Sequence, residues 1–491
     1  MCSPNRSTGT FARLAVAIFA VALLATAGVA EVCAQSPASA APSAEIPASY
    51  TPDQSAPMDP AVPEILPMRQ RAEVVNEVLQ ERLDEVVPLV MRRAGVDMWI
   101  VSAREYNEDP VIETMLPATW QSARRRTILV FYDRGEAGDG ARPSEGSGVE
   151  RLAIARYDVG DLFPTAWEKS EQPDQWARLA EVVAERDPQS IAVNRSETFA
   201  LADGLTDTEY AHLRDALPEP YRARLTSDDR LAIGWLETRT ERERTLYSQI
   251  VRIAHAVIAD GLSEQAIQPG VTTTADLEWW YRDRIRELGF TAWFHPSVSI
   301  QRQGMTEDGD FSSDAEAATI QPGDLVHVDF GISYLRLNTD TQQHAYILKP
   351  GETEPPAGLQ EGLRIGNRLQ DHVTDAFATG RTGNEVLATA LEEARAEGIR
   401  PTIYTHPIGH HGHGGGPLIG LWDQQDGVPG RGDYPLHAHT AYSIELNAEV
   451  SVPGWNGQDV LIKLEEDAYF DGESVRYLDG RQTELYVVPR R

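Results

Sequence analysis

Acidic and imidazole side chains in the last third of the chain have the composition of a two-metal site. Two divalent ions need oxygen ligands that offset roughly four positive charges, and a carboxylate can bind one ion or bridge both. Such a pair of ions activates water, so the set predicts metal-assisted hydrolysis. The candidate ligands are Asp329, Asp340, Glu445, Glu465 and a histidine of the run 406–413.

The two aspartates are eleven residues apart, and the first lies inside an apolar run. Asp329 follows the alternating residues Leu325 to Val328, where an unpaired carboxylate would cost several kcal/mol. A metal ion is one natural partner for it. Strand alternation across a short turn can bring Asp340 to the same face. The alternative is a hairpin on which both side chains are merely solvated.

The two glutamates repeat this pattern. Glu445 lies in the strand-like run 441–446 and Glu465 in 460–465, and the turn between them carries Pro and Gly at 452–457. An antiparallel pair would set the two carboxylates side by side. Each alone could be an ordinary surface residue, since Glu is seldom buried. Two acidic pairs together with a histidine cluster favour metal.

Histidine and glycine dominate the segment 405–417, which holds four histidines between positions 406 and 413. Glycine permits close approach of the backbone, and imidazole is a common metal ligand. This composition is typical of a site, although a loose histidine-rich loop is the alternative.

Bulk composition excludes some partners. The chain has 491 residues, enough for two or three domains, and 41% apolar residues, which is typical of a folded protein. Its formal net charge of -31 leaves no basic surface for nucleic acid or anionic lipid.

The N-terminus has the pattern of a secretory signal. Arg6 and Arg13 precede the apolar run 14–30, and small residues follow up to Ala34. We expect a signal peptide over 1–34, cleaved after Ala34 or alternatively after Ala30. An uncleaved anchor is the alternative, since the run of seventeen residues is near the lower limit for a membrane span.

Cleavage after Ala34 would leave no cysteine, because Cys2 and Cys33 are the only two. Export without disulfides suits a periplasmic or secreted protein of the bacterial envelope. We expect no stable membrane insertion after cleavage.

The rest of the chain divides by pattern into three parts. Residues 35–64, rich in Ala, Pro and Ser, predict a disordered linker. Short strands alternate with helical patterns over 65–236, which indicates an α/β domain. Residues 237–491 contain helices followed by closing antiparallel strands, an α+β pattern. The expected helices are 71–93, 239–259, 274–288, 358–379 and 382–397.

The order Asp, eleven residues, Asp, then His, Glu and Glu behind an α/β domain resembles the pita-bread metallopeptidases. That family includes Xaa-Pro aminopeptidases, prolidases, methionine aminopeptidases and creatinase. The similarity covers about residues 65–491 and is clearest at 327–331, 443–446 and 463–467. It implies a catalytic pita-bread domain preceded by a creatinase-type N-terminal domain.

The resemblance also implies roles for the carboxylates. Asp329 would chelate one ion, while Asp340 and Glu465 would bridge two. Glu445 would ligate the other ion and act as the base for a metal-bridging water. We expect two divalent ions, manganese first, with cobalt, zinc or iron as alternatives.

The motif offers two histidines as the metal ligand. The family pattern Gly-His-x-x-Gly fits Gly412 to Gly416, so His413 is the expected ligand. A prolidase-like variant with a paired upstream histidine makes His410 the alternate ligand. His406 would then help to hold the substrate or transition state.

Three departures from the family pattern concern substrate contacts. A histidine about seventeen residues before the first Asp is missing, since that register falls near Ser312. Gln342 and Gln343 replace the Thr-Arg pair that follows the second Asp. The second histidine, seven residues after the ligand, is absent for both His410 and His413.

The leading hypothesis is an exported two-metal exopeptidase, similar to Xaa-Pro aminopeptidases or dipeptidases, that acts on peptides and forms a homodimer. Peptide as substrate and the dimer come only from the resemblance. One alternative is a creatinase-like C–N hydrolase. The other is a binding protein on a catalytically retired peptidase fold, which the complete ligand set opposes because buried carboxylates without metal destabilise a fold.

Overall fold

The computed structural model describes residues 62–135, 148–305 and 317–490. The expected signal peptide, and the linker up to residue 61, lie outside the described residues. No helix in the described ranges is long and apolar enough to cross a membrane.

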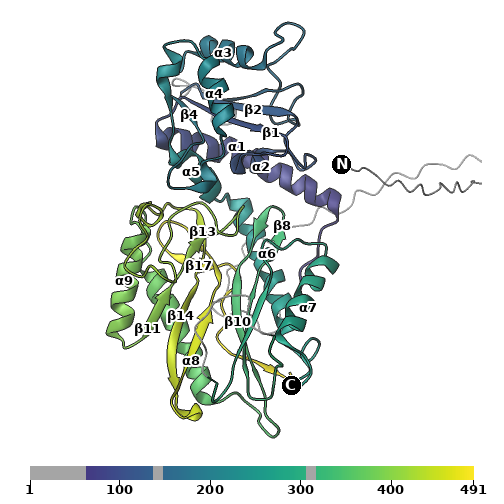
Figure 1. Cartoon of the computed structure of the whole chain (residues 1–491), viewed down its shortest axis with the longest axis vertical. Helices are drawn as coiled ribbons and strands as arrows, with labels where there is room; N and C mark the ends of the chain where they lie inside the picture. Colours follow the sequence, from purple (N-terminus) through teal and green to yellow (C-terminus); the bar gives the residue numbers. More distant parts are fainter. Residues whose placement is uncertain (1–61, 136–147, 306–316, 491) are drawn as a thin grey trace, which may run out of the picture. The chain divides into compact units, whose positions relative to one another are not determined.

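The N-terminal part is built around a mixed sheet with strand order β3-β2-β1-β4-β5 (Figure 1). β1 pairs antiparallel with β2 and parallel with β4. Alternation along β1 and β2 supplies both faces: Trp99 and Phe131 point to one apolar cluster, Ile100 and Val130 to the other. The strands are β1 (Met98–Arg104), β2 (Arg126–Asp133), β3 (Val149–Ile154), β4 (Ile191–Val193) and β5 (Leu225–Thr226).

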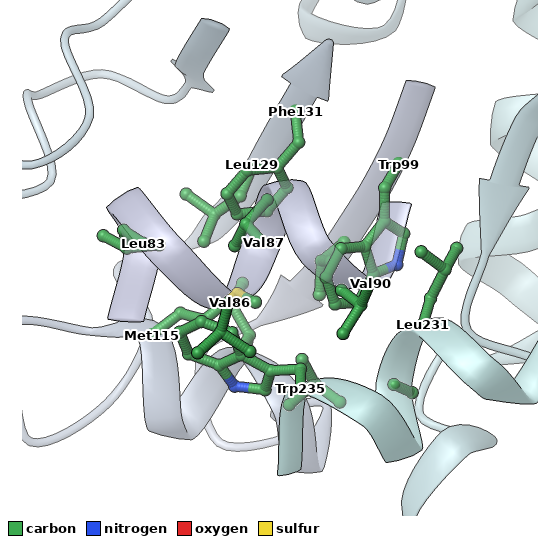
Figure 2. Close-up of a cluster of buried hydrophobic side chains, with 14 of the residues drawn as sticks. Leu83, Val86, Val87, Val90, Trp99, Met115, Leu129, Phe131, Leu231 and Trp235 are labelled. Carbon is green, nitrogen blue, oxygen red and sulfur yellow. The ribbon is translucent and has the colours of Figure 1, made fainter. Parts of the chain in front are cut away.

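Helices cover both faces of this sheet. The cluster in Figure 2 joins α1 and α5 to the strands, with Val86 and Val90 of α1 near Trp235. The opposite cluster holds residues of α3 and α4. These layers are the α/β architecture that the alternating pattern predicts. The helices are α1 (Met68–Ala94), α2 (Pro110–Met115), α3 (Gln175–Arg186), α4 (Asp207–Ala216) and α5 (Asp229–Glu237).

The C-terminal part contains two units in which helices pack on antiparallel strands. In the first, α6 and α7 contribute to the apolar cluster around Val326 and Val328 of β7. Its sheet has the order β18-β10-β7-β6. Its elements are α6 (Glu241–Gly261), α7 (Thr274–Glu287), β6 (Ser297–Gln301), β7 (Leu325–Phe330), β8 (Ser333–Tyr334), β9 (Leu337–Asn338), β10 (Thr341–Ile347) and β18 (Tyr486–Val488).

In the second unit, α8 and α9 pack on a sheet of order β11-β14-β15. Gly362 and Gly366 of α8 leave room for Ile462 and Leu464 of β15. A further sheet has the order β12-β13-β16-β17. The elements are α8 (Ala357–Asp375), α9 (Gly383–Ala396), β11 (Arg400–Ile403), β12 (His406–Pro407), β13 (Thr440–Ser443), β14 (Leu446–Val452), β15 (Gln458–Leu464), β16 (Asp467–Phe470) and β17 (Val475–Tyr477).

Local signals explain where the long helices begin. Thr240 and Glu243 form a capping box at the start of α6, and Thr382 and Glu385 form another at α9. The five expected helices are all present, with ends shifted by one to three residues in most cases. The expected domain boundary at 236/237 falls before the last residue of α5, three residues ahead of the Thr240 cap of α6, and stays a prediction.

The two C-terminal units join along the free edge of β15. The backbone N–H of Gln342 donates to the carbonyl of Glu465 at 3.0 Å, and the Glu465 N–H donates back at 3.3 Å. Further along, the Gln301 carboxamide bonds both backbone groups of Leu461. This seam fixes β10 beside β15, and with them the aspartates beside the glutamates.

A buried ion pair links α1 to α6. Arg82, 1% exposed, donates to Glu243 at 2.6 Å, and Arg239 donates to the other Glu243 oxygen at 3.0 Å. Arg82 also lies over the ring of Trp235, 4.3 Å from its centre. Burial lowers the pKa of Arg82 to about 10, against the attraction of Glu243.

Replacing Arg82 by Ala should reduce the free energy of unfolding by roughly 3–5 kcal/mol, because it leaves buried polar groups without a partner. Arg242→Ala is the matched control, since Arg242 of α6 pairs with Glu77 and Glu81 of α1 and is 40% exposed. Its expected cost is at most about 1 kcal/mol. Equal losses in urea unfolding would contradict the role of the buried pair.

Candidate metal centre

Four carboxylates that are far apart in sequence converge where the two C-terminal units meet. Asp329 is near the end of β7, Asp340 directly precedes β10, Glu445 directly precedes β14 and Glu465 follows β15. Oxygens of Asp329, Asp340 and Glu465 lie within 4.8 Å of one another. A second group within this distance joins Glu445 and Glu465 to a nitrogen of His406. The structure therefore brings all four predicted carboxylates together.

These carboxylates are shielded from water and repel one another. Asp340, Glu445 and Glu465 are 4%, 7% and 1% exposed, and Asp329 is partly buried. Burial, followed by repulsion from Glu465, raises the pKa of Asp329, Asp340 and Glu445 well above the ordinary range. Buried Oδ1 atoms of both aspartates have no hydrogen-bond partner among the described residues. This donor set fits divalent cations, which would neutralise it.

His406 faces this cluster from β12. Its Nδ1 lies 3.0 Å from the carbonyl of Pro407, so Nδ1 carries the proton and Nε2 keeps a free lone pair. Nε2 lies 3.3 Å from Glu465 Oε1 and 3.6 Å from Asp340 Oδ2. Nε2 is buried and accepts no hydrogen bond from any described residue. The atom is oriented as a metal ligand would be.

His413, the expected ligand, lies at the mouth of the site. Its side chain is exposed, and its ring packs edge-on against His406 at 4.8 Å and against Trp293 at 5.3 Å. One of its nitrogens still lies within 4.8 Å of ligand atoms of Asp340 and His406. Asp340, His406 and His413 therefore form a third group that could hold a metal ion.

His410, the alternate ligand, points elsewhere. Its Nδ1 donates to the carbonyl of Arg336 at 3.1 Å, and its Nε2 lies 3.6 Å from Glu243. It belongs to none of the groups that could hold a metal in the described residues.

Gln342 ties the two glutamates together, a role that we did not expect from the sequence. Its amide nitrogen donates to Glu445 Oε1 at 2.6 Å and to Glu465 Oε2 at 2.7 Å. Its carbonyl lies 2.8 Å from Nε2 of His327, which can donate to it. Spacing was the available signal, because Gln342 is two residues after Asp340 and His327 two before Asp329. In a strand, such positions share a face.

Glu466, the residue after Glu465, belongs to a buried network of charged and polar side chains next to the four carboxylates. Gln343 donates to Glu466 at 2.9 Å, and His255 lies 2.8 Å from Glu466 and 3.1 Å from Asp479. Although burial lowers the pKa of His255, these carboxylates raise it to about 10. His255 is therefore a buried cation at neutral pH.

The register of the missing family histidine, near Ser312, lies outside the described residues.

Aromatic rings line the approach to His406 and His413. Tyr404 lies 5.4 Å from His406 and 5.7 Å from Trp422, measured between ring centres. Trp293 packs on Phe294 at 4.5 Å. A Cβ added to Gly412 would lie 2.3 Å from the Trp293 ring, so this position requires glycine. These aromatic side chains form an apolar wall next to the candidate metal ligands, and this wall can contact an apolar ring of a bound molecule.

The raised pKa values predict how the metal-free protein responds to pH. Carboxylates whose pKa is higher folded than unfolded stabilise the fold at low pH, and this contribution is lost as pH rises through the folded pKa. We expect the melting temperature of the chelated protein to fall as the pH rises above the ordinary carboxyl pKa of about 4. Glu445→Gln should flatten this slope, whereas Glu449→Gln, in the exposed pair with Arg400, should not. Parallel slopes for all three proteins would contradict the assignment.

Comparison with known proteins agrees with this geometry. Residues 246–477 match the model of Metallopeptidase family M24. No curated protein sequence gave a significant match.

Solved structures resemble almost the entire described fold. The X-Pro aminopeptidase from Thermotoga maritima matches with a TM-score of 0.57 at 18% identity, over 82% of this chain and 100% of that chain. The Xaa-Pro dipeptidase from Bacillus anthracis matches at 0.53 and 17%, over 86% and 100%. The prolidase from Pyrococcus furiosus matches at 0.50 and 14%, over 80% and 98%.

At these identities the structures show the fold, and they confirm the expected pita-bread architecture with an N-terminal domain in front. The sequence match supplies the family. Through residues 246–477, the chain belongs to metallopeptidase family M24, the pita-bread metallopeptidases.

Proposed function

We propose that this protein is a two-metal exopeptidase that cuts the first peptide bond of its substrate, with proline after the cut. The observation that carries the proposal is the convergence of four carboxylates and the free Nε2 of His406 on one small region. The names of the similar structures, X-Pro aminopeptidase and prolidase, support the substrate class.

In this proposal His406 replaces His413 as the histidine ligand, because Nε2 of His406 faces the carboxylates while His413 is exposed. The family spacing is then restored. His413 follows His406 by seven residues, and Gly409 completes the His-x-x-Gly pattern. Asp329, Asp340, His406, Glu445 and Glu465 would then hold the two ions.

Two bound ions would lower the pKa of a shared water and polarise the scissile carbonyl. Glu445 is the candidate base for that water. Gln342 holds Glu445 through Oε1, which leaves Oε2 to receive the proton. His413, at the mouth, is placed to donate to the substrate, and the Trp293 ring against it limits its movement.

Metal content tests the assignment of the histidines. The wild-type protein should retain about two ions per chain after reconstitution with manganese and removal of loose ions. His406→Ala should retain at most about one, while His413→Ala keeps about two and loses activity. The reverse pattern, measured by elemental analysis, would restore His413 as the ligand. A wild-type protein without metal would instead favour the binding-protein alternative.

Proline preference rests on the aromatic wall, since proline rings pack well in grooves lined by aromatic side chains. The proposal predicts that Ala-Pro-Ala is cut with a kcat/KM at least about tenfold above that of Ala-Ala-Ala, as 1–3 kcal/mol of apolar contact allows. Equal rates for the two peptides would reject the preference and keep the exopeptidase.

The chain's place in the cell, its native metal and its assembly belong to the same proposal. Export is supported by Arg6, Arg13 and the apolar run 14–30, and manganese and a homodimer by the family resemblance. N-terminal sequencing of the mature protein from the envelope fraction would locate the cleavage site after Ala34 or Ala30.

A further inference from the structure

A cavity of 460 Å³ lies on the sheet that carries the two catalytic glutamates. We call it the Asn447 groove. Three strands form its floor, and the segment that follows the histidine-rich run contributes a wall. Its lining includes Arg400, Thr402, Trp422, Asn447, Glu449 and Leu461.

The groove occupies the same face of the sheet as the metal ligands. α8 packs against the even-numbered residues Ile462 and Leu464 of β15 and Val450 of β14. Alternation therefore turns the odd-numbered side chains, including Glu445 and Asn447, to the opposite face. The strand register arranges the side chains of this face in two rows that run across β11, β14 and β15. These rows are Thr402, Asn447 and Lys463, then Arg400, Glu449 and Leu461.

Aromatic contacts connect the groove to the ligands. Trp422, in the groove wall, lies 5.7 Å from Tyr404 between ring centres. Tyr404 in turn lies 5.4 Å from His406 and 5.9 Å from His413. Asn447 is two residues beyond Glu445 on the same strand. The metal centre and the groove are thus neighbouring parts of one surface.

Asn447 is the feature that points to a ligand. The residue is 3% exposed and lines the groove. A peptide backbone offers the carbonyl and N–H that a carboxamide side chain can bind. The hydroxyl of Thr402, beside it in the register, can add a second polar contact.

We propose that the Asn447 groove binds the residues that follow the scissile bond, so that the substrates are oligopeptides and not dipeptides. This inference rests on the proposed exopeptidase function, which leaves a single residue on the other side of the cut. From Glu445 to Glu449 the strand advances by about 13 Å, at roughly 3.3 Å per residue. An extended peptide of three or four residues has about this length.

The test compares peptides of increasing length on the manganese-loaded protein, from Ala-Pro to Ala-Pro-Ala-Ala-Ala. We expect kcat/KM to rise by about tenfold or more between the dipeptide and the tetrapeptide, as one or two additional hydrogen bonds allow. Asn447→Ala should reduce the ratio of tetrapeptide to dipeptide kcat/KM by about fivefold to tenfold. Thr402→Val, which keeps the shape of the side chain, should lower the ratio in the same direction.

Ser451→Ala is the matched control, because Ser451 is an exposed residue of the same strand and does not line the groove. The ratio of tetrapeptide to dipeptide kcat/KM of Ser451→Ala should equal that of the wild type. Equal cleavage of all lengths by the wild type, or an unchanged ratio in both groove variants, would overturn this inference alone. Failure to cut any peptide would overturn the proposed function, and this inference with it.

Discussion

Mutual repulsion among four carboxylates, three of them buried, is the constraint around which the C-terminal part is built. Each loses hydration, and each raises the cost of ionising its neighbours, as the raised pKa values of Asp329, Asp340 and Glu445 show. Such a cluster is unfavourable in a fold unless cations neutralise it. Gln342 offsets part of the cost by donating to both glutamates, and Ser443 donates to Glu465 at 2.7 Å. These donors fix the orientation of both glutamate side chains.

The antiparallel seam between β10 and β15 is what places the acids in one site. Each half of the C-terminal part supplies one pair: the aspartates lie in β7 and directly before β10, the glutamates directly before β14 and directly after β15. Backbone hydrogen bonds between Gln342 and Glu465 set the register of one half against the other. A slip by one residue would turn Glu465 away from the aspartates, because successive strand residues face opposite sides. The arrangement of the four carboxylates therefore depends on how the strands pair.

The sheet next to the two glutamates also forms the floor of the proposed peptide groove, so it connects the proposed substrate specificity with the candidate metal centre. Odd-numbered residues run from Glu445, directly before β14, through Asn447 to Glu449, so the proposed peptide groove begins two residues from a candidate metal ligand. The histidine-rich segment packs against the site. Gly412 lies against the ring of Trp293, and the exposed His413 contacts the same ring. Tyr404 and Trp422 join this segment to the groove. One curved surface can thereby position the scissile bond and the residues behind it.

The sequence by itself determined the features with local or strictly periodic signals. Apolar alternation around Asp329 and Glu465 marked strands that carry an acid among apolar residues, and periodic apolar patterns marked the five long helices of the chain. Only the tertiary structure showed that His406 and His413 lie at the carboxylates while His410 does not, because a glycine-rich segment has no period that sets side-chain direction. It also revealed Gln342 and His327, whose contacts join strands that are separated by up to 123 residues in the chain. Periodicity fixes which face a residue occupies, whereas packing between distant strands decides what it meets there.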